Sequence, residues 1–337
     1  MPRHLKSFTY LVAVGAILAL RTHPTLALPT PRVQPDPFTS VREEFNNGDY
    51  DKAIDILSML IQRDPKAAGA WQLRGQAYAA KGDSTRALAD MEECVRLAPG
   101  RAEGYLGRGF VRVCLGQVDE ALRDFDRGIA QSPGEIAGYL HRGHLYGLVG
   151  EFKKALEDCD RAISLQPDRP DAYCERARVH YRQGNNDLAL KDLEVALSKD
   201  NKHVDCYRAR AAVFMATGRY EKAAEDYTVI INSCPKIARA YCERAAAYLH
   251  IPAFPRAVDD INQSLKLDPN LWEALFYRAQ VRRHFGQLGE ALADMGRAIQ
   301  LQPNNPVLYR FRATIHRAMN EIEKAEADEN KARMLNE

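Results

Sequence analysis

The sequence predicts an all-α fold, an α-solenoid built from stacked antiparallel helix pairs. Two observations carry this prediction: proline, alanine and glycine each recur every 34 residues, and the segments between them have helical apolar periodicity. The 337-residue chain has 46% hydrophobic and 27% charged residues, the profile of a folded, water-soluble protein. Its net charge of +2 creates no overall field to hold a nucleic-acid backbone, so we expect no nucleic-acid partner.

Two of the three columns mark where helices end. Glycine, or once asparagine, can adopt the left-handed conformation that closes a first helix, and proline cannot continue a second helix, so it sets the turn to the next repeat. The proline column is Pro65, Pro99, Pro133, Pro167, Pro235, Pro269 and Pro303, with Asn201 in the remaining place. The turn column is Gly48, Gly82, Gly116, Gly150, Gly184, Gly218 and Gly286, with Pro252 and Asn320 in the other two places.

Small and large residues alternate in the predicted core. An alanine early in each second helix and a small residue in each first helix let two backbones approach closely, and an aromatic residue fills the space beside them. The alanines are Ala53, Ala87, Ala121, Ala155, Ala189, Ala223, Ala257, Ala291 and Ala325. The small first-helix residues are Gly75, Gly109, Gly143, Ala177, Ala211, Ala245, Ala279 and Ala313, and the aromatic column is Trp71, Tyr105, Tyr139, Tyr173, Tyr207, Tyr241 and Tyr309, with Leu275 completing it.

The run that contains Trp71, Gly75, Tyr78, Ala87 and Pro99 resembles the tetratricopeptide repeat signature at its usual spacings. It departs from that pattern at Arg74, where leucine is usual. The resemblance covers nearly all of the chain after its amino-terminal segment. It implies a right-handed superhelix whose first helices line a concave groove. It is specific for fold and weak for function, because this fold serves many binding tasks.

These columns divide the chain into an amino-terminal segment and one repeat array. Residues 1–27 read as a signal peptide, with a basic start and a short apolar run, and residues 28–37 as a proline-rich linker. We therefore expect an exported protein, periplasmic or extracellular, of the kind found among exported repeat proteins of this family; the alternative is an uncleaved membrane anchor. The solenoid covers 38–337, with a degenerate repeat at 38–67 and full repeats at 68–101, 102–135, 136–169, 170–203, 204–237, 238–271, 272–305 and 306–337.

Two charged columns keep the same period, and we expect them to form ion pairs between the two helices of each repeat. The arginines are Arg74, Arg108, Arg142, Arg176, Arg210, Arg244, Arg278 and Arg312. The aspartates are Asp90, Asp124, Asp158, Asp192, Asp226, Asp260, Asp294 and Asp328.

The sequence favours neither an enzyme nor a cofactor protein. It has no nucleophile elbow, phosphate loop or dinucleotide fingerprint, so we expect no catalysis, no cofactor and no small-molecule substrate. His141 and His144 have the spacing of metal ligands on one helix, but no third ligand is evident and we expect no metal. The seven cysteines form no CxxC pair, which indicates neither a zinc site nor a disulfide framework, and that number is unusual for an exported chain.

The predicted function is a protein-binding scaffold that holds an extended peptide or protein segment in the concave groove. The resemblance places the groove-lining residues on the first helices, where we expect Leu106, Phe110, Leu140, His141, His144, Arg178, Arg208, Phe276 and Arg310. The alternative is a self-assembling structural element of the cell envelope, whose repeat surfaces stack on one another. A membrane contact is expected only through an uncleaved amino-terminal segment.

Overall fold

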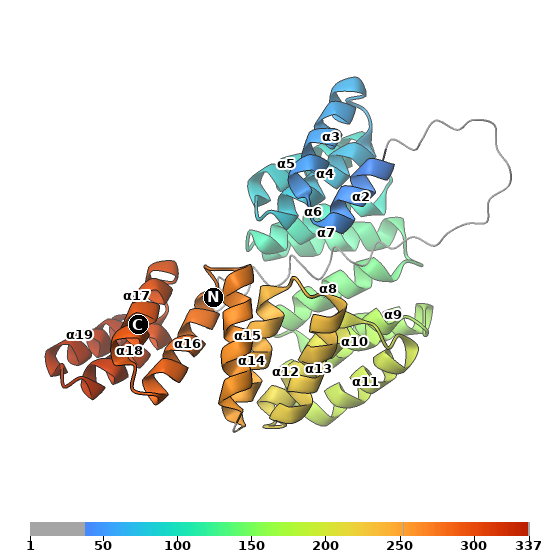
Figure 1. The fold of residues 1–337 in the computed structure, drawn as a ribbon. Helices are drawn as coiled ribbons and strands as arrows, with labels where there is room; N and C mark the ends of the chain where they lie inside the picture. The colour runs from blue at the N-terminus through green and yellow to red at the C-terminus, as the bar shows by residue number, and fades with distance from the viewer. Residues whose placement is uncertain (1–37, 252, 336–337) are drawn as a thin grey trace. The chain divides into compact units, whose positions relative to one another are not determined.

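The computed structural model describes residues 38–251 and 253–335. Every regular element in these residues is an α-helix, and none is a strand (Figure 1). The predicted all-α solenoid of helix pairs is therefore confirmed. The proposed signal peptide, the linker and Pro252 lie outside the described residues.

The helices divide into two compact units. The first ends at Gly184 and holds α2 (Thr39–Asn47), α3 (Tyr50–Arg63), α4 (Ala68–Ala80), α5 (Ser84–Leu97), α6 (Ala102–Cys114), α7 (Val118–Gln131), α8 (Ile136–Val149), α9 (Phe152–Leu165) and α10 (Pro170–Arg182). The second begins at Asn185 and holds α11 (Asn186–Lys199), α12 (Val204–Ala216), α13 (Tyr220–Ser233), α14 (Ala238–His250), α15 (Phe254–Leu267), α16 (Trp272–His284), α17 (Leu288–Leu301), α18 (Pro306–Ala318) and α19 (Ile322–Met334).

The first helices other than α14 end in a tight turn that has a left-handed residue. All seven glycines of the turn column have positive φ, between 72° and 86°, and Asn320 takes the same conformation with φ 60°. Asn320 is the one non-glycine residue with positive φ in the described chain, which fits the tolerance of asparagine for this conformation. The turn residues thus set where the chain reverses between the two helices of a pair.

The two helices of a repeat touch at the alanine column. All nine alanines are completely buried, with 0% of their surface exposed. The facing small residue is also required: a Cβ atom added to Gly109 would lie 2.7 Å from Cε1 of Phe125, well inside van der Waals contact. Close approach of the helices therefore depends on small residues on both sides of the contact.

The arginine and aspartate columns pair as the sequence predicts. Seven of the eight arginines each donate two hydrogen bonds to one carboxylate of the aspartate column in the same unit. The Nε–Oδ2 distances are 2.7–2.9 Å and the Nη2–Oδ1 distances 2.6–2.8 Å. The aspartates of these seven pairs are buried, so in seven repeats a bidentate ion pair is shielded from water.

The aromatic column connects this ion pair to the preceding turn. Trp71 Nε1 and the hydroxyl groups of Tyr139, Tyr173, Tyr207, Tyr241 and Tyr309 donate to a backbone carbonyl of the proline column, at 3.0–3.3 Å. The arginine Cζ of the same repeat lies 4.8–6.0 Å from the centre of the aromatic ring. One chain of contacts thus joins the turn, the first helix and the second helix.

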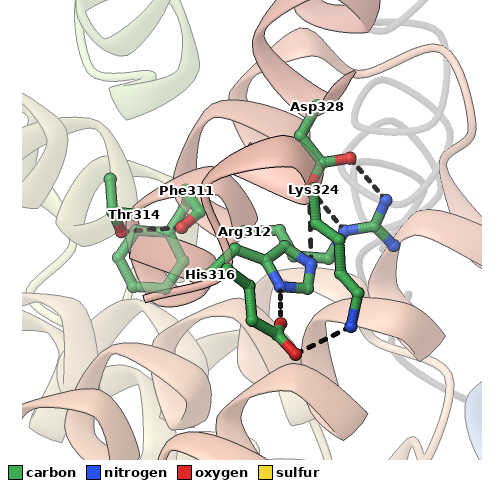
Figure 2. Close-up of polar contacts among 7 residues, drawn as sticks. Phe311, Arg312, Thr314, His316, Lys324 and Asp328 are labelled. Atoms are coloured by element: carbon green, nitrogen blue, oxygen red, sulfur yellow. Dashed lines mark hydrogen bonds and ion pairs between the residues drawn. The ribbon is translucent and has the colours of Figure 1, made fainter. Parts of the chain in front are cut away.

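The last repeat closes the array with polar contacts (Figure 2). Arg312 meets Asp328 as in the other repeats, and His316 Nδ1 lies 2.6 Å from Oε2 of Glu321, whose other oxygen accepts from Lys324 at 2.7 Å. On the outward side of α19, Glu326, Glu329 and Arg333 stand where the preceding repeat has Leu292, Met295 and Ile299. Charged residues at these core positions give the end of the array a solvated surface, as a terminal repeat requires.

The Arg142–Asp158 pair provides a test of this architecture. Replacing Arg142 with Met leaves Asp158 buried without its cation, and we expect a loss of roughly 3 kcal/mol in the free energy of unfolding, measured by urea denaturation. The matched control is Arg123→Met, which removes an exposed pair with Glu120 and should change stability by less than about 1 kcal/mol. Equal effects of the two substitutions would show that the buried pair does not stabilise the repeat.

Candidate functional site

Several successive first helices contact one another within a unit. In the first unit α4 contacts α6, α6 contacts α8 and α8 contacts α10, and in the second unit α14 contacts α16. We call the first-helix face the surface formed by the fifth, sixth and ninth residues of each first helix. In α8 these are Leu140, His141 and His144.

The apolar residues expected on this face are half-buried and contribute to the core. Leu106 packs with the cluster around Phe125 and Leu145, and Leu140 packs with the cluster around Ile136 and Tyr139. In the second unit, Phe276 makes an edge contact with Phe311, their ring centres 5.1 Å apart. These side chains therefore serve packing, and only their outer edges remain for a partner.

His141 is held by aromatic rings. Its imidazole stacks on Phe125, with ring centres 5.8 Å apart and planes inclined by 23°, and the ring of Phe110 lies 6.4 Å away. Burial, helped by the nearby His144, lowers the pKa of His141 to about 4. The ring is therefore neutral at neutral pH and adds apolar surface to this part of the face.

His144 belongs to a polar network between α8 and α10. Its Nδ1 atom lies 2.7 Å from Oε1 of Glu175, and the other oxygen of Glu175 accepts from Nη1 of Arg178 at 3.0 Å. Glu175 is only 6% exposed. Burial alone would raise the pKa of Glu175, but His144, Arg178 and Arg182 outweigh it and hold the pKa well below its usual range. The two predicted face residues His144 and Arg178 are thus joined by a buried carboxylate.

The two remaining predicted arginines differ in whether they form an ion pair. Arg208 donates to Oδ1 of Asp205 in the preceding turn of α12 at 2.9 Å, so its charge is already balanced. Arg310 on α18 is exposed and makes no ion pair with any residue that the structure describes. Arg310 is therefore a predicted face residue whose charge is available to a partner.

Two features are absent from the residues that the structure describes. No three His, Cys, Asp or Glu side chains in residues 38–251 and 253–335 come together in a way that could hold a metal ion. In the same ranges no helix has the length and apolarity needed to cross a membrane. What the first-helix face presents is half-buried aromatic edges and paired or free charges.

Sequence reasoning missed Glu175, the residue that connects the network. The signal was present in the repeat alignment, because Glu175 stands one period after His141, in a column that otherwise holds small, apolar or aromatic residues except at Glu243. An ionisable residue in a half-buried column needs a partner nearby. His144 and Arg178, at the ninth positions of two successive first helices, are those partners.

A substitution at Glu175 tests the network. The pKa of Glu175 is lower in the folded protein than in the unfolded chain. Glu175 therefore stabilises the fold at any pH above its unfolded pKa, and this stabilisation is lost as the pH falls through its folded pKa. We expect Glu175→Gln to lower the free energy of unfolding by roughly 2 kcal/mol at pH 7. The difference from the native chain should shrink on acidification, as followed by urea unfolding at a series of pH values. A difference that does not vary with pH would contradict the assignment.

Models of the tetratricopeptide repeat match the chain at residues 38–102, 143–213, 208–271 and 254–306. Together these segments cover more than half of the sequence. No curated protein matches the chain in sequence.

Solved structures share the fold at low sequence identity. The chain is similar to the APC/C hetero-tetramer Cut9–Hcn1, with TM-score 0.62, 17% identity and coverage of 86% of this chain and 55% of that one, so it spans little more than half the length of that relative. It is also similar to yeast Tom70, with TM-score 0.60, 16% identity and coverage of 98% and 70%. A tetratricopeptide repeat protein from Parabacteroides merdae gives TM-score 0.53, 19% identity and coverage of 77% and 98%.

Proposed function

The chain belongs to the tetratricopeptide repeat family, and we propose that it is a non-catalytic scaffold that binds an extended segment of a partner protein on its first-helix faces. Repeats of this family generally mediate protein–protein interaction. We infer from the side chains of the first-helix face that this face receives the extended segment.

One observation carries the proposal: the first-helix face varies from repeat to repeat while the alanine, arginine and aspartate columns do not. The alanine column holds the same residue in nine places. The ninth residues of the first helices are instead Gln76, Phe110, His144, Arg178, Ala212, Ala246, Gln280 and Thr314. Packing requires regularity at the core positions, so varied side chains on the first-helix face of each unit suit the recognition of an irregular partner.

The chemistry of the face suits a peptide with both apolar and charged residues. The outer edges of Phe110 and Phe276 offer contact for apolar side chains, and Arg310 offers a charged hydrogen-bond donor. The alternative of self-assembly by end-to-end stacking has less support. The outward side of α19 presents Glu326, Glu329 and Arg333, and a stacked copy would have to bury these charges.

We propose in addition that the chain is exported. Five of its cysteines, Cys94, Cys159, Cys174, Cys206 and Cys242, are buried, and none of the seven forms a disulfide. Burial raises the pKa of the thiols of Cys94, Cys159 and Cys242 and raises that of Cys114 to about 11. Thiols in this state are poor nucleophiles, so free cysteines are compatible with an oxidising compartment.

Amino-terminal sequencing of the protein from its native source tests export. The predicted cleavage follows Ala27, so we expect the mature chain to begin at Leu28. An intact amino terminus at Met1 on membrane-bound protein would favour the uncleaved anchor. An intact terminus on protein that stays inside the cell would overturn the proposal of export.

Capture of partners from native extract tests the scaffold function. The full chain and its Arg310→Glu variant are each used as bait, and bound proteins are identified by mass spectrometry. Because Arg310 is exposed and unpaired within the described chain, reversing its charge should leave the fold intact and reduce partner recovery by roughly tenfold, the effect of one lost charged contact.

The matched control is Lys266→Glu, which reverses an exposed charge on the second helix α15 of the same unit. We expect it to recover partners as the native chain does. If both variants lose partners equally, the binding surface does not lie on the first-helix face. A failure of the native chain to recover any protein, together with sedimentation as an oligomer, would favour self-assembly.

A further inference from the structure

Two glutamates occupy the same position in different units, and their surroundings differ. Glu175 is the sixth residue of α10 and Glu243 is the sixth residue of α14. The partners of Glu175 are His144, on the preceding first helix, and Arg178, one turn further along α10. The residues at the two corresponding places around Glu243 are Ala212 and Ala246. The fold therefore repeats the carboxylate and replaces both of its partners with alanine.

Glu243 gains no partner from elsewhere in the described chain. It makes no hydrogen bond or ion pair with residues 38–251 or 253–335, and the two arginines near it are engaged by other carboxylates. Arg208 donates to Asp205 at 2.9 Å, and Arg239 donates to Oε1 of Glu273 at 2.6 Å. Oε2 of Glu273 is buried and has no hydrogen-bond partner among the described residues. Two carboxylates of one small region thus have unfilled acceptor positions.

The charges of this region do not balance. The two arginines that act on Glu243, Arg208 and Arg239, are each bonded to another carboxylate, so this set has three carboxylates and two arginines. Burial raises the pKa of Glu243, and the opposing effect of Arg208 and Arg239 is too small to restore it. A single added cation would complete the set and favour the ionised carboxylate.

Two tyrosines are close enough to the same carboxylate for its charge to affect them. Tyr227 on α13 and Tyr277 on α16 both interact electrostatically with Glu243, and burial raises the pKa of each phenol, that of Tyr277 to about 12. Both rings are therefore neutral at neutral pH. Neutral phenol rings in the same region as a carboxylate suit a cationic side chain, because a ring face attracts a cation and its hydroxyl oxygen can accept a hydrogen bond.

We propose that the region formed by Glu243, Glu273, Tyr227 and Tyr277, beside Ala212 and Ala246, receives a lysine or arginine side chain of the bound protein segment. This proposal rests on the scaffold function and names the chemistry of its partner. The incoming cation takes the place that the side chains of His144 and Arg178 fill in the first unit. The corresponding position in the first unit is satisfied from within and receives no such side chain.

Fluorescence anisotropy with the full chain tests the proposal. The probes are three labelled peptides of equal length with the same glycine, serine and leucine background, one with two arginines, one with two glutamines and one with two glutamates. We expect the arginine peptide to bind most tightly. Glu243→Gln should weaken its binding by roughly tenfold to a hundredfold, the effect of losing a hydrogen-bonded charge pair.

The second variant restores the partners found in the first unit. Ala212→His combined with Ala246→Arg supplies Glu243 with an imidazole and a guanidinium from the chain itself. We expect this variant to bind the arginine peptide as weakly as Glu243→Gln does. It should be folded and melt no lower than the native chain, as followed by circular dichroism, because the buried carboxylate gains partners. The control Glu221→Gln, on the exposed side of the second helix α13, should bind the arginine peptide like the native chain.

The outcomes separate this proposal from the scaffold function. Equal affinity for the three peptides, no binding of the arginine peptide, or equal binding by the native chain and both variants overturns the basic side-chain site. If the native chain nevertheless captures a partner that is lost on Arg310→Glu, the scaffold function stands without this site. Loss of the arginine peptide in both variants, with the control unchanged, establishes the site.

Discussion

The architecture depends on how closely the two helices of each repeat approach one another. Completely buried alanines on the second helix and glycine or alanine on the first bring the backbones together, and even one added methyl group at Gly109 would collide with Phe125. At this separation the arginine of the first helix reaches the aspartate of the second with both of its hydrogen bonds. A bidentate pair requires a fixed distance and a fixed orientation, so it also selects this way of packing the helices over looser alternatives.

The same constraint explains which features the sequence reveals. The alanine, proline, glycine, arginine and aspartate columns could be predicted because each repeat needs them for the same physical reason. At Asn320, asparagine replaces glycine in the turn column and keeps the left-handed conformation, so the column reflects a backbone requirement. The ion pairs were predicted from period alone, because opposite charges that recur in step with the core have one simple place to meet.

The first-helix face could be predicted only in part. The sequence indicated which helices carry it, but did not indicate that Leu106 and Leu140 pack into the core or that Glu175 connects His144 to Arg178. The contact between His144 and Glu175 joins residues 31 positions apart, and it occurs once in the described chain instead of in every repeat. A contact made once leaves no periodic pattern in the sequence, so only the three-dimensional structure reveals it. For the same reason, the residues that distinguish this protein from others with its fold are those least visible in the pattern.

The contrast between Glu175 and Glu243 follows from this distinction between repeated and single features. A carboxylate in a half-buried column is costly unless a cation lies beside it, and the first unit meets that requirement with its own His144 and Arg178. The second unit keeps the carboxylate and loses both partners, which serves no purpose for packing, because every other repeat in this unit has a small or aromatic residue there. A residue that lowers the stability of the fold and does not improve its packing is characteristic of functional sites. The excess charge at Glu243 is therefore better explained by a cation that arrives with a partner than by the stability of the repeat.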